Sequence, residues 1–199
     1  RRGAVLESLH VEDDGVIARV SGEVMRAHLV VGADGADSKV RELRDLPTRR
    51  RDYQQAGLVA TLRTQQPHLG TAWQRFLPTG PIALLPLPGD FSSIVWSTDP
   101  QDAAELVAMS TERFNAVVSE AFEHRFGEVV WSGERGQFPL RRVEAVNYVA
   151  PRTVLVGDAA HTIHPLAGQG LNLGLLDAAA LAQVMADARA AGRNAFSRV

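Results

Sequence analysis

The chain has 199 residues, of which 45% are hydrophobic and 22% are charged, and its formal net charge is -2. This composition indicates a globular protein with a sizeable core, and so small a net charge offers no field that would gather nucleic acid. Because cysteine is absent, disulfides, thiolate metal sites and cysteine nucleophiles are excluded. No apolar run approaches the ~20 residues that span a bilayer.

The first fifty residues predict a β-hairpin followed by a third strand. Two runs of alternating polar and apolar residues, 5–12 and 16–20, flank the turn Asp13-Asp14-Gly15. Residues 27–31 are apolar at consecutive positions near the end of the run, which is typical of a strand buried on both faces. This strand is expected to stop at Gly32-Ala33-Asp34-Gly35.

The middle of the chain predicts a separate antiparallel sheet with two helices. Asp99-Pro100 is typical of a helix start, and Phe114, Val118 and Phe122 fall on one stripe of a later helix that Gly127 would end. A strand-like stretch follows at 129–131. Strand-forming residues precede these helices in four runs, at 57–62, 72–77, 81–87 and 92–98.

A second buried run, 153–156, ends at Gly157-Asp158, and a final helix is predicted from Leu171 to about Ala190. Two buried strands far apart in the sequence thus each end in glycine and a nearby carboxylate. Ligands of α/β sheets bind beyond the carboxyl ends of such strands, so the pattern predicts one ligand contacted from both places. Backbone amides near residues 170–172 would point at this ligand and favour an electron-rich edge.

Residues 157–174 read Gly-Asp-Ala-Ala-His-Thr-Ile-His-Pro-Leu-Ala-Gly-Gln-Gly-Leu-Asn-Leu-Gly. This segment resembles the signature of the class A flavoprotein monooxygenases, the fold group of para-hydroxybenzoate hydroxylase. The loop at 32–41 resembles the same group's Asp-Gly signature, with Ser38 and Arg41 at the spacings of that signature. Residues 161–177, together with 74–76 and 84–87, look most like the ubiquinone-biosynthesis hydroxylases.

The resemblance implies an α/β fold of mixed α+β character: part of an FAD-binding domain at 1–47 and 143–199, and an antiparallel-sheet substrate domain at 48–142. The implied activity is hydroxylation of an aromatic ring, with FAD as cofactor and NAD(P)H and dioxygen as co-substrates. A prenylated phenol of ubiquinone biosynthesis is the expected substrate, and a ubiquinone-biosynthesis complex the expected partner. Such an enzyme is expected in the cytoplasm, with at most peripheral contact with the inner membrane.

The resemblance also implies individual roles. Asp158 would bond the ribityl chain of the flavin, Asp34 would lie near its pyrophosphate or ribityl region, and Arg41 would help to admit the nicotinamide nucleotide. No metal ligand and no catalytic residue is assigned. The expected cofactor-binding residues are Gly32, Asp34, Gly35, Ser38, Arg41, Gly157, Asp158, Pro165, Gly168, Gln169, Gly170, Leu171 and Asn172, and the expected substrate-binding residues are Phe76, Leu85 and Leu166.

The sequence departs from the family at its ends. The N-terminal Gly-x-Gly-x-x-Gly turn, which holds the ADP half of FAD, is absent, and Gly168-x-Gly170 with Gly174 does not replace it because the third glycine comes one position late. The chain begins without methionine or a signal-peptide core, and family members continue beyond Val199. The chain is therefore expected to be a fragment that alone binds FAD poorly and is inactive.

Simpler interpretations remain open. A Gly-Asp pair at a strand end is often only a turn, Asp37 is expected to be a solvated neighbour or a helix cap, and Trp96 is expected in the core. His161 and His164 are three residues apart without a third ligand nearby, so no metal site is predicted, and a general-base role stays undecided. The whole protein could instead hydroxylate a water-soluble phenol or benzoate, or be a flavin-free assembly subunit.

Overall fold

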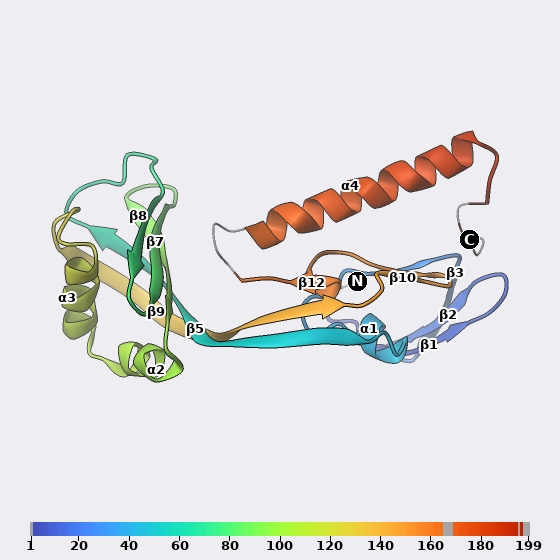
Figure 1. The fold of residues 1–199 in the computed structure, drawn as a ribbon, viewed down its shortest axis with the longest axis horizontal. Coiled ribbons are helices and arrows are strands. Elements are labelled where there is room, and N and C mark those ends of the chain that lie inside the picture. The colour runs from blue at the N-terminus through green and yellow to red at the C-terminus, as the bar shows by residue number, and fades with distance from the viewer. Residues whose placement is uncertain (1, 165–168, 195, 197–199) are drawn as a thin grey trace. The chain divides into compact units, whose positions relative to one another are not determined.

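The computed structural model describes residues 2–164, 169–194 and 196. They form two compact units: unit 1 contains residues 1–51 and 141–199, and unit 2 contains residues 52–140. Unit 1 is therefore built from the two ends of the chain, drawn in blue and in orange to red (Figure 1).

Unit 1 opens with a three-stranded antiparallel sheet of β1 (Leu6–Val11), β2 (Val16–Val20) and β3 (Glu23–Ala27), in that order. The predicted hairpin is confirmed: Val11 pairs with Val16, and the Gly15 carbonyl accepts a hydrogen bond of 2.8 Å from the Glu12 amide. Strand β3 was not predicted. All five of its residues are exposed, so it has no buried face that a sequence pattern could mark.

A second small sheet of unit 1 has the order β10-β11-β4, from β4 (Val30–Gly32), β10 (Val149–Ala150) and β11 (Thr153–Leu155). The prediction of one strand over 27–31, buried on both faces, is wrong. Ala27 ends β3, and Val31 is 43% exposed because β4 lies at the edge of its sheet. Strand β11 lies parallel to β4 and has the expected burial.

The rest of unit 1 is α1 (Lys39–Leu43), the 3₁₀ turn η1 (Gly157–Ala159), β12 (His161–Thr162) and α4 (Gln169–Ala190). The last helix is confirmed and begins two residues before its predicted start. Helix α1 was not predicted as a separate element. The core of this unit is small and consists of Val40, Ala145, Leu155, Ala159 and Ala160.

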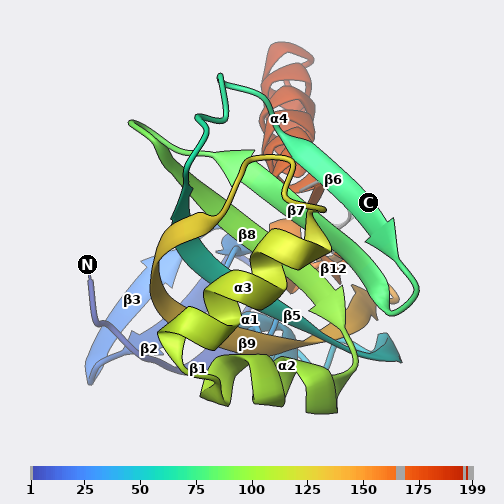
Figure 2. The same ribbon diagram turned by 90° about the vertical axis from the view of Figure 1, so that its left-hand side faces the viewer.

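Unit 2 contains the predicted antiparallel sheet, whose strands have the order β9-β5-β8-β7-β6. Strands β5 and β9 continue into unit 1, where β12 pairs with the end of β9. Figure 2 shows helices α2 (Pro100–Ala108) and α3 (Thr111–Ala121) against the sheet. The strands are β5 (Thr48–Thr64), β6 (Trp73–Leu77), β7 (Gly80–Pro86), β8 (Phe91–Thr98) and β9 (Val129–Ala145).

Alternate residues of the sheet face the two helices and form the main core. Ile82, Ile94 and Trp96 belong to one buried cluster with Phe114 and Val118 of α3, which confirms the helical stripe and the core position of Trp96. The prediction that Gly127 ends this helix is wrong. The helix already ends at Ala121, and the next turn reverses the chain through Glu123 and His124, whose φ angles are 54° and 52°.

Across the described ranges, no helix combines the length and the apolar character that a membrane crossing requires.

Candidate functional site

The two strands that were predicted to share a ligand lie side by side. Gly32 of β4 pairs with Leu155 of β11, and the Val156 amide donates a hydrogen bond of 2.9 Å to the Gly32 carbonyl. Because the strands are parallel, their carboxyl ends meet at the same edge of the sheet. Gly32 is needed for this packing, since a Cβ at this position would lie 2.7 Å from Leu155 Cδ2 and 3.1 Å from Val40 Cβ.

After β4, the Asp34 carboxylate caps helix α1. Its Oδ1 accepts a hydrogen bond of 2.5 Å from the Ser38 hydroxyl, and its Oδ2 accepts from the amides of Lys39 at 2.7 Å and Val40 at 3.0 Å. Ser38 Oγ in turn accepts from the Arg41 amide at 3.0 Å. The first amides of α1 are thus bonded within the protein. This geometry favours a role for Asp34 in shaping the turn, and its contact with a cofactor stays a prediction.

Arg41 connects the two turns. Its side chain is buried; Nη1 donates a hydrogen bond of 2.8 Å to the Ala159 carbonyl beyond β11, and Nη2 donates one of 2.6 Å to the Ala36 carbonyl beyond β4. Burial lowers the pKa of the guanidinium from its ordinary value, with the nearby charge of Arg50 as a second cause. The arrangement makes Arg41 a tether between segments 118 residues apart in the sequence.

Asp158 has a different environment from Asp34. It lies in η1 directly after Gly157, whose φ of 60° is a conformation that favours glycine. The Asp158 side chain is exposed, and no hydrogen bond to its carboxylate comes from the described part of the chain. No described residue therefore competes with a ligand for the hydrogen bonds that this carboxylate can accept.

The start of α4 lies beside this turn. A Cβ at Gly170 would lie 3.8 Å from Asp158 Oδ1, and a Cβ at Gly174 would lie 3.3 Å from the Gly157 Cα. The amides of the first turn of a helix have no partner within the helix itself, and such amides are able to bind a ligand at a helix start. Gln169, Leu171 and Asn172 are exposed there. The remaining predicted residues of this loop, Pro165, Leu166 and Gly168, lie outside the described residues.

Asp177 is a site residue that the sequence analysis missed. Its Oδ2 accepts a hydrogen bond of 2.8 Å from the Gly157 amide and lies 2.6 Å from His161 Nε2. The helical period could have indicated it, because Gly170, Gly174 and Asp177 follow one another at intervals of four and three residues. These three residues mark the face of α4 that lies against the turn.

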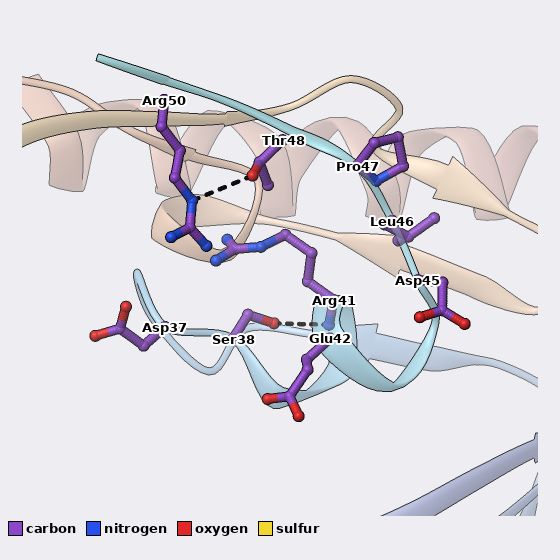
Figure 3. A pocket seen from close by; sticks show the side chains of 9 residues that line it. All are labelled: Asp37, Ser38, Arg41, Glu42, Asp45, Leu46, Pro47, Thr48 and Arg50. Atoms are coloured by element: carbon purple, nitrogen blue, oxygen red, sulfur yellow. Dashed lines mark hydrogen bonds between the residues drawn. The ribbon is translucent and has the colours of Figure 1, made fainter. Parts of the chain in front are cut away.

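A polar hollow of about 460 Å³ adjoins the Asp34 turn (Figure 3). Arg50 contributes to it and was not singled out from the sequence; its Nε donates a hydrogen bond of 3.3 Å to Thr48 Oγ1. Asp37 forms an exposed ion pair of 2.6 Å with Arg141, so Asp37 is the expected solvated neighbour, and Ser38 is the helix cap. The hollow is lined by Asp37, Ser38, Arg41, Glu42, Asp45, Leu46, Pro47, Thr48 and Arg50.

The predicted substrate residues of unit 2 lie on its sheet. Phe76 of β6 is 75% exposed and Leu85 of β7 is 38% exposed, while Leu84, next to Leu85, is buried in the core under the helices. Because side chains alternate along a strand, Leu85 lies on the face away from this core. Phe76 pairs with Pro81, and Leu85 pairs with Ser93. The structure thus leaves both side chains outside the core, and their contact with a substrate stays a prediction.

His164 follows β12 and carries a testable pH dependence. Burial lowers the pKa of this imidazole below its ordinary value. As the pH falls, His164 is therefore protonated in the unfolded chain before it is protonated in the folded protein. The free energy of unfolding is thus undiminished by His164 above about pH 6.5 and decreases as the pH falls below that value. We expect the Tm of the full-length protein to fall less on acidification in His164→Gln than in the wild type.

The control for this variant is His124→Gln, at an exposed ring 2.9 Å from Glu128, which should behave as the wild type does. Equal acid sensitivity of His164→Gln and the wild type would contradict this assignment.

Two parallel strands that end at glycine and aspartate turns beside the start of a long helix form the arrangement with which α/β proteins bind cofactors. The chain belongs to the FAD binding domain family, which matches residues 1–194. This membership confirms the family that the two loops indicated and the mixed α/β fold class. The site suits FAD, since the Asp158 carboxylate accepts no hydrogen bond from the residues that the structure describes and the helix start has no side chain at Gly170.

Several known proteins are similar to the chain. The 3-demethoxyubiquinol 3-hydroxylase of Escherichia coli (strain K12) is 42% identical over 188 residues, which are 94% of this chain and 48% of that protein. Ubiquinone hydroxylase UbiL of Rhodospirillum rubrum is 42% identical over 190 residues, which are 95% of this chain and 44% of that protein. The chain thus spans about half the length of the curated relatives it matches.

A solved structure shares the fold. The crystal structure of pqsL, a probable FAD-dependent monooxygenase from Pseudomonas aeruginosa, has a TM-score of 0.77 and 26% sequence identity to the chain. The match covers 97% of this chain and 57% of that one. Nearly all of this chain therefore corresponds to part of the fold of a longer chain.

Proposed function

We propose that the chain is part of an FAD-dependent, NAD(P)H-using monooxygenase that hydroxylates an aromatic ring, with a prenylated phenol of ubiquinone biosynthesis as substrate. The observation that carries the proposal is the Asp158 carboxylate, which accepts no hydrogen bond from the described residues and lies beside the start of α4 and at the shared edge of β4 and β11. The 42% identity to two ubiquinone hydroxylases supports the choice of substrate class.

The residues of unit 1 would divide the work of holding the cofactor. The Asp158 carboxylate would accept hydrogen bonds from the ribityl hydroxyls, and the first amides of α4 would bind the electron-rich edge of the ring system. Arg41 would keep the turn after β4 next to the turn after β11. When bound, FAD would supply electron transfer from NAD(P)H to dioxygen.

The two compact units support a division of labour. We propose that unit 1 is the flavin-binding part and that the sheet of unit 2 receives the substrate, with Phe76 and Leu85 on its open face. The expected boundaries, 47/48 and 142/143, lie near those of the compact units, 51/52 and 140/141. A prenyl tail is poorly soluble in water, so the substrate would be taken up at a membrane surface, alone or within a ubiquinone-biosynthesis complex.

The test measures NAD(P)H oxidation and product formation by the full-length protein with a panel of phenols. Turnover of prenylated phenols, with little turnover of short-chain phenols or benzoates, is the result expected. Preference for a benzoate or an unsubstituted phenol would replace the proposed substrate class with a water-soluble one. A colourless full-length preparation that binds no added FAD would instead support a flavin-free assembly subunit and would overturn the proposal.

A further inference from the structure

A single carboxylate oxygen fixes both sides of the turn that carries Asp158. Asp177 Oδ2 accepts the Gly157 amide at 2.8 Å, one residue before Asp158, and lies 2.6 Å from the Nε2 of His161, three residues after it. Asp177 comes from α4, the helix whose start lies beside the same turn. The carboxylate therefore joins three segments: the end of β11, the short strand β12 and the helix.

The environment of His161 defines how it binds Asp177. The residue is only 8% exposed, its ring lies 5.6 Å from the Tyr148 ring, and the buried Nδ1 has no hydrogen-bond partner within the described residues. A proton on Nδ1 would be a buried donor without an acceptor, which is costly. The geometry therefore favours Nε2 as the donor, in a charge-assisted hydrogen bond to Asp177.

The backbone around Asp177 and His161 is closely packed, which leaves little room for other side chains to take over their hydrogen bonds. Gly157 has a φ of 60°, and its Cα would lie only 3.3 Å from a Cβ at position 174. The backbone of the turn therefore packs directly against the backbone of the helix at these two glycines. His161 itself is held by β12, where it pairs with Glu144 of β9. Without the Asp177 hydrogen bonds, the Gly157 amide and the His161 Nε2 would lose their partners, and the backbone that carries Asp158 would lose an anchor on each side.

We propose that Asp177 and His161 are positioning residues that hold the Asp158 turn and the start of α4 in the conformation that binds FAD. The inference rests on the proposed function of this site. Neither side chain is assigned a contact with the cofactor, and neither is assigned a proton transfer. Their removal should therefore weaken FAD binding through Asp158 and leave the strands and the core in place.

The test compares FAD affinity, by titration of the flavin-free full-length protein, among the wild type and variants whose fold is checked by circular dichroism. Asp177→Asn should weaken FAD binding by about 10-fold, as loss of an outer partner of a ligand residue commonly does at metal sites. Asp187→Asn is the matched control, because Asp187 is on the same helix and, within the described residues, its carboxylate accepts a hydrogen bond from the exposed Gln183 alone. It should bind FAD as the wild type does.

Two variants of His161 separate positioning from general stability. His161→Gln can place an amide N–H near the position of Nε2 and should keep affinity within about 3-fold of the wild type, whereas His161→Ala should lose about 10-fold. If Asp177→Asn does not fold, this pair still decides the question. If the wild type binds FAD and the two His161 variants bind it with equal affinity, whether weakly or strongly, the inference is overturned. A wild type that binds no FAD would overturn the proposed function as well.

Discussion

Replacing Asp158 with alanine in the full-length protein is expected to weaken FAD binding by about 100-fold, the upper range for hydrogen bonds to a charged group. The carboxylate is exposed and accepts no hydrogen bond from the residues that the structure describes, so its removal breaks no contact among them. The loss should therefore appear in the affinity for FAD and hardly at all in the Tm of the flavin-free protein. Fluorescence titration and thermal unfolding measure the two effects separately.

Asp37→Ala is the matched control for this variant. Asp37 is also an exposed carboxylate in one of the two turns, and within the described ranges it forms a surface ion pair with Arg141. Surface ion pairs contribute little, about 0 to 1 kcal/mol, so this variant should keep both stability and FAD affinity. An Asp158→Ala protein that binds FAD as tightly as Asp37→Ala does would remove Asp158 from the cofactor site.

Replacing Arg41 with methionine is expected to lower the free energy of unfolding by about 2–5 kcal/mol, because the buried Ala159 carbonyl and the half-buried Ala36 carbonyl lose their donors. Methionine keeps much of the volume of the side chain, so the change isolates the two hydrogen bonds to Ala36 and Ala159. The two turns would then no longer be tied together. FAD affinity should fall along with stability, in contrast to the Asp158 variant.

Lys39→Met, on the same helix, is the control for the Arg41 variant. Lys39 is exposed, and its ammonium group is 2.6 Å from Glu42 in a surface ion pair. Chemical denaturation should show an unfolding free energy within about 1 kcal/mol of the wild type for this control. A similarly small effect of Arg41→Met would show that the buried guanidinium does not tether the turns.

The elements with strong local signals could be predicted from the sequence. Three elements are marked by the residue types within them and are found where they were expected. They are the Asp13-Asp14-Gly15 turn, the Asp99-Pro100 helix start and the strand before Gly157-Asp158. Strand β3 has no buried face, and β4 owes its exposure to its place at a sheet edge, which is a property of the sheet and not of its own residues. Such features depend on pairing that no local pattern records.

In the candidate site, too, some residues could be predicted from the sequence and others could not. The glycines and aspartates of the two turns were visible as motifs, and the parallel pairing of β4 with β11 brings their turns together. The parts that join them were not visible. Arg41 was expected near a ligand, yet its guanidinium binds two backbone carbonyls, and Asp177 was passed over although it holds Gly157 and His161. Contacts between residues far apart in the sequence decide these roles.

The central claim is that the turns after β4 and β11, together with the start of α4, hold one flavin. The structure of the full-length protein with bound FAD tests this most directly, through the distance from the Asp158 carboxylate to the nearest ribityl hydroxyl. We expect a hydrogen bond of about 2.5–3.0 Å there, and contacts from the turn at residues 32–35 to the same FAD molecule. An FAD molecule bound away from Asp158, with neither turn in contact with it, would contradict the claim.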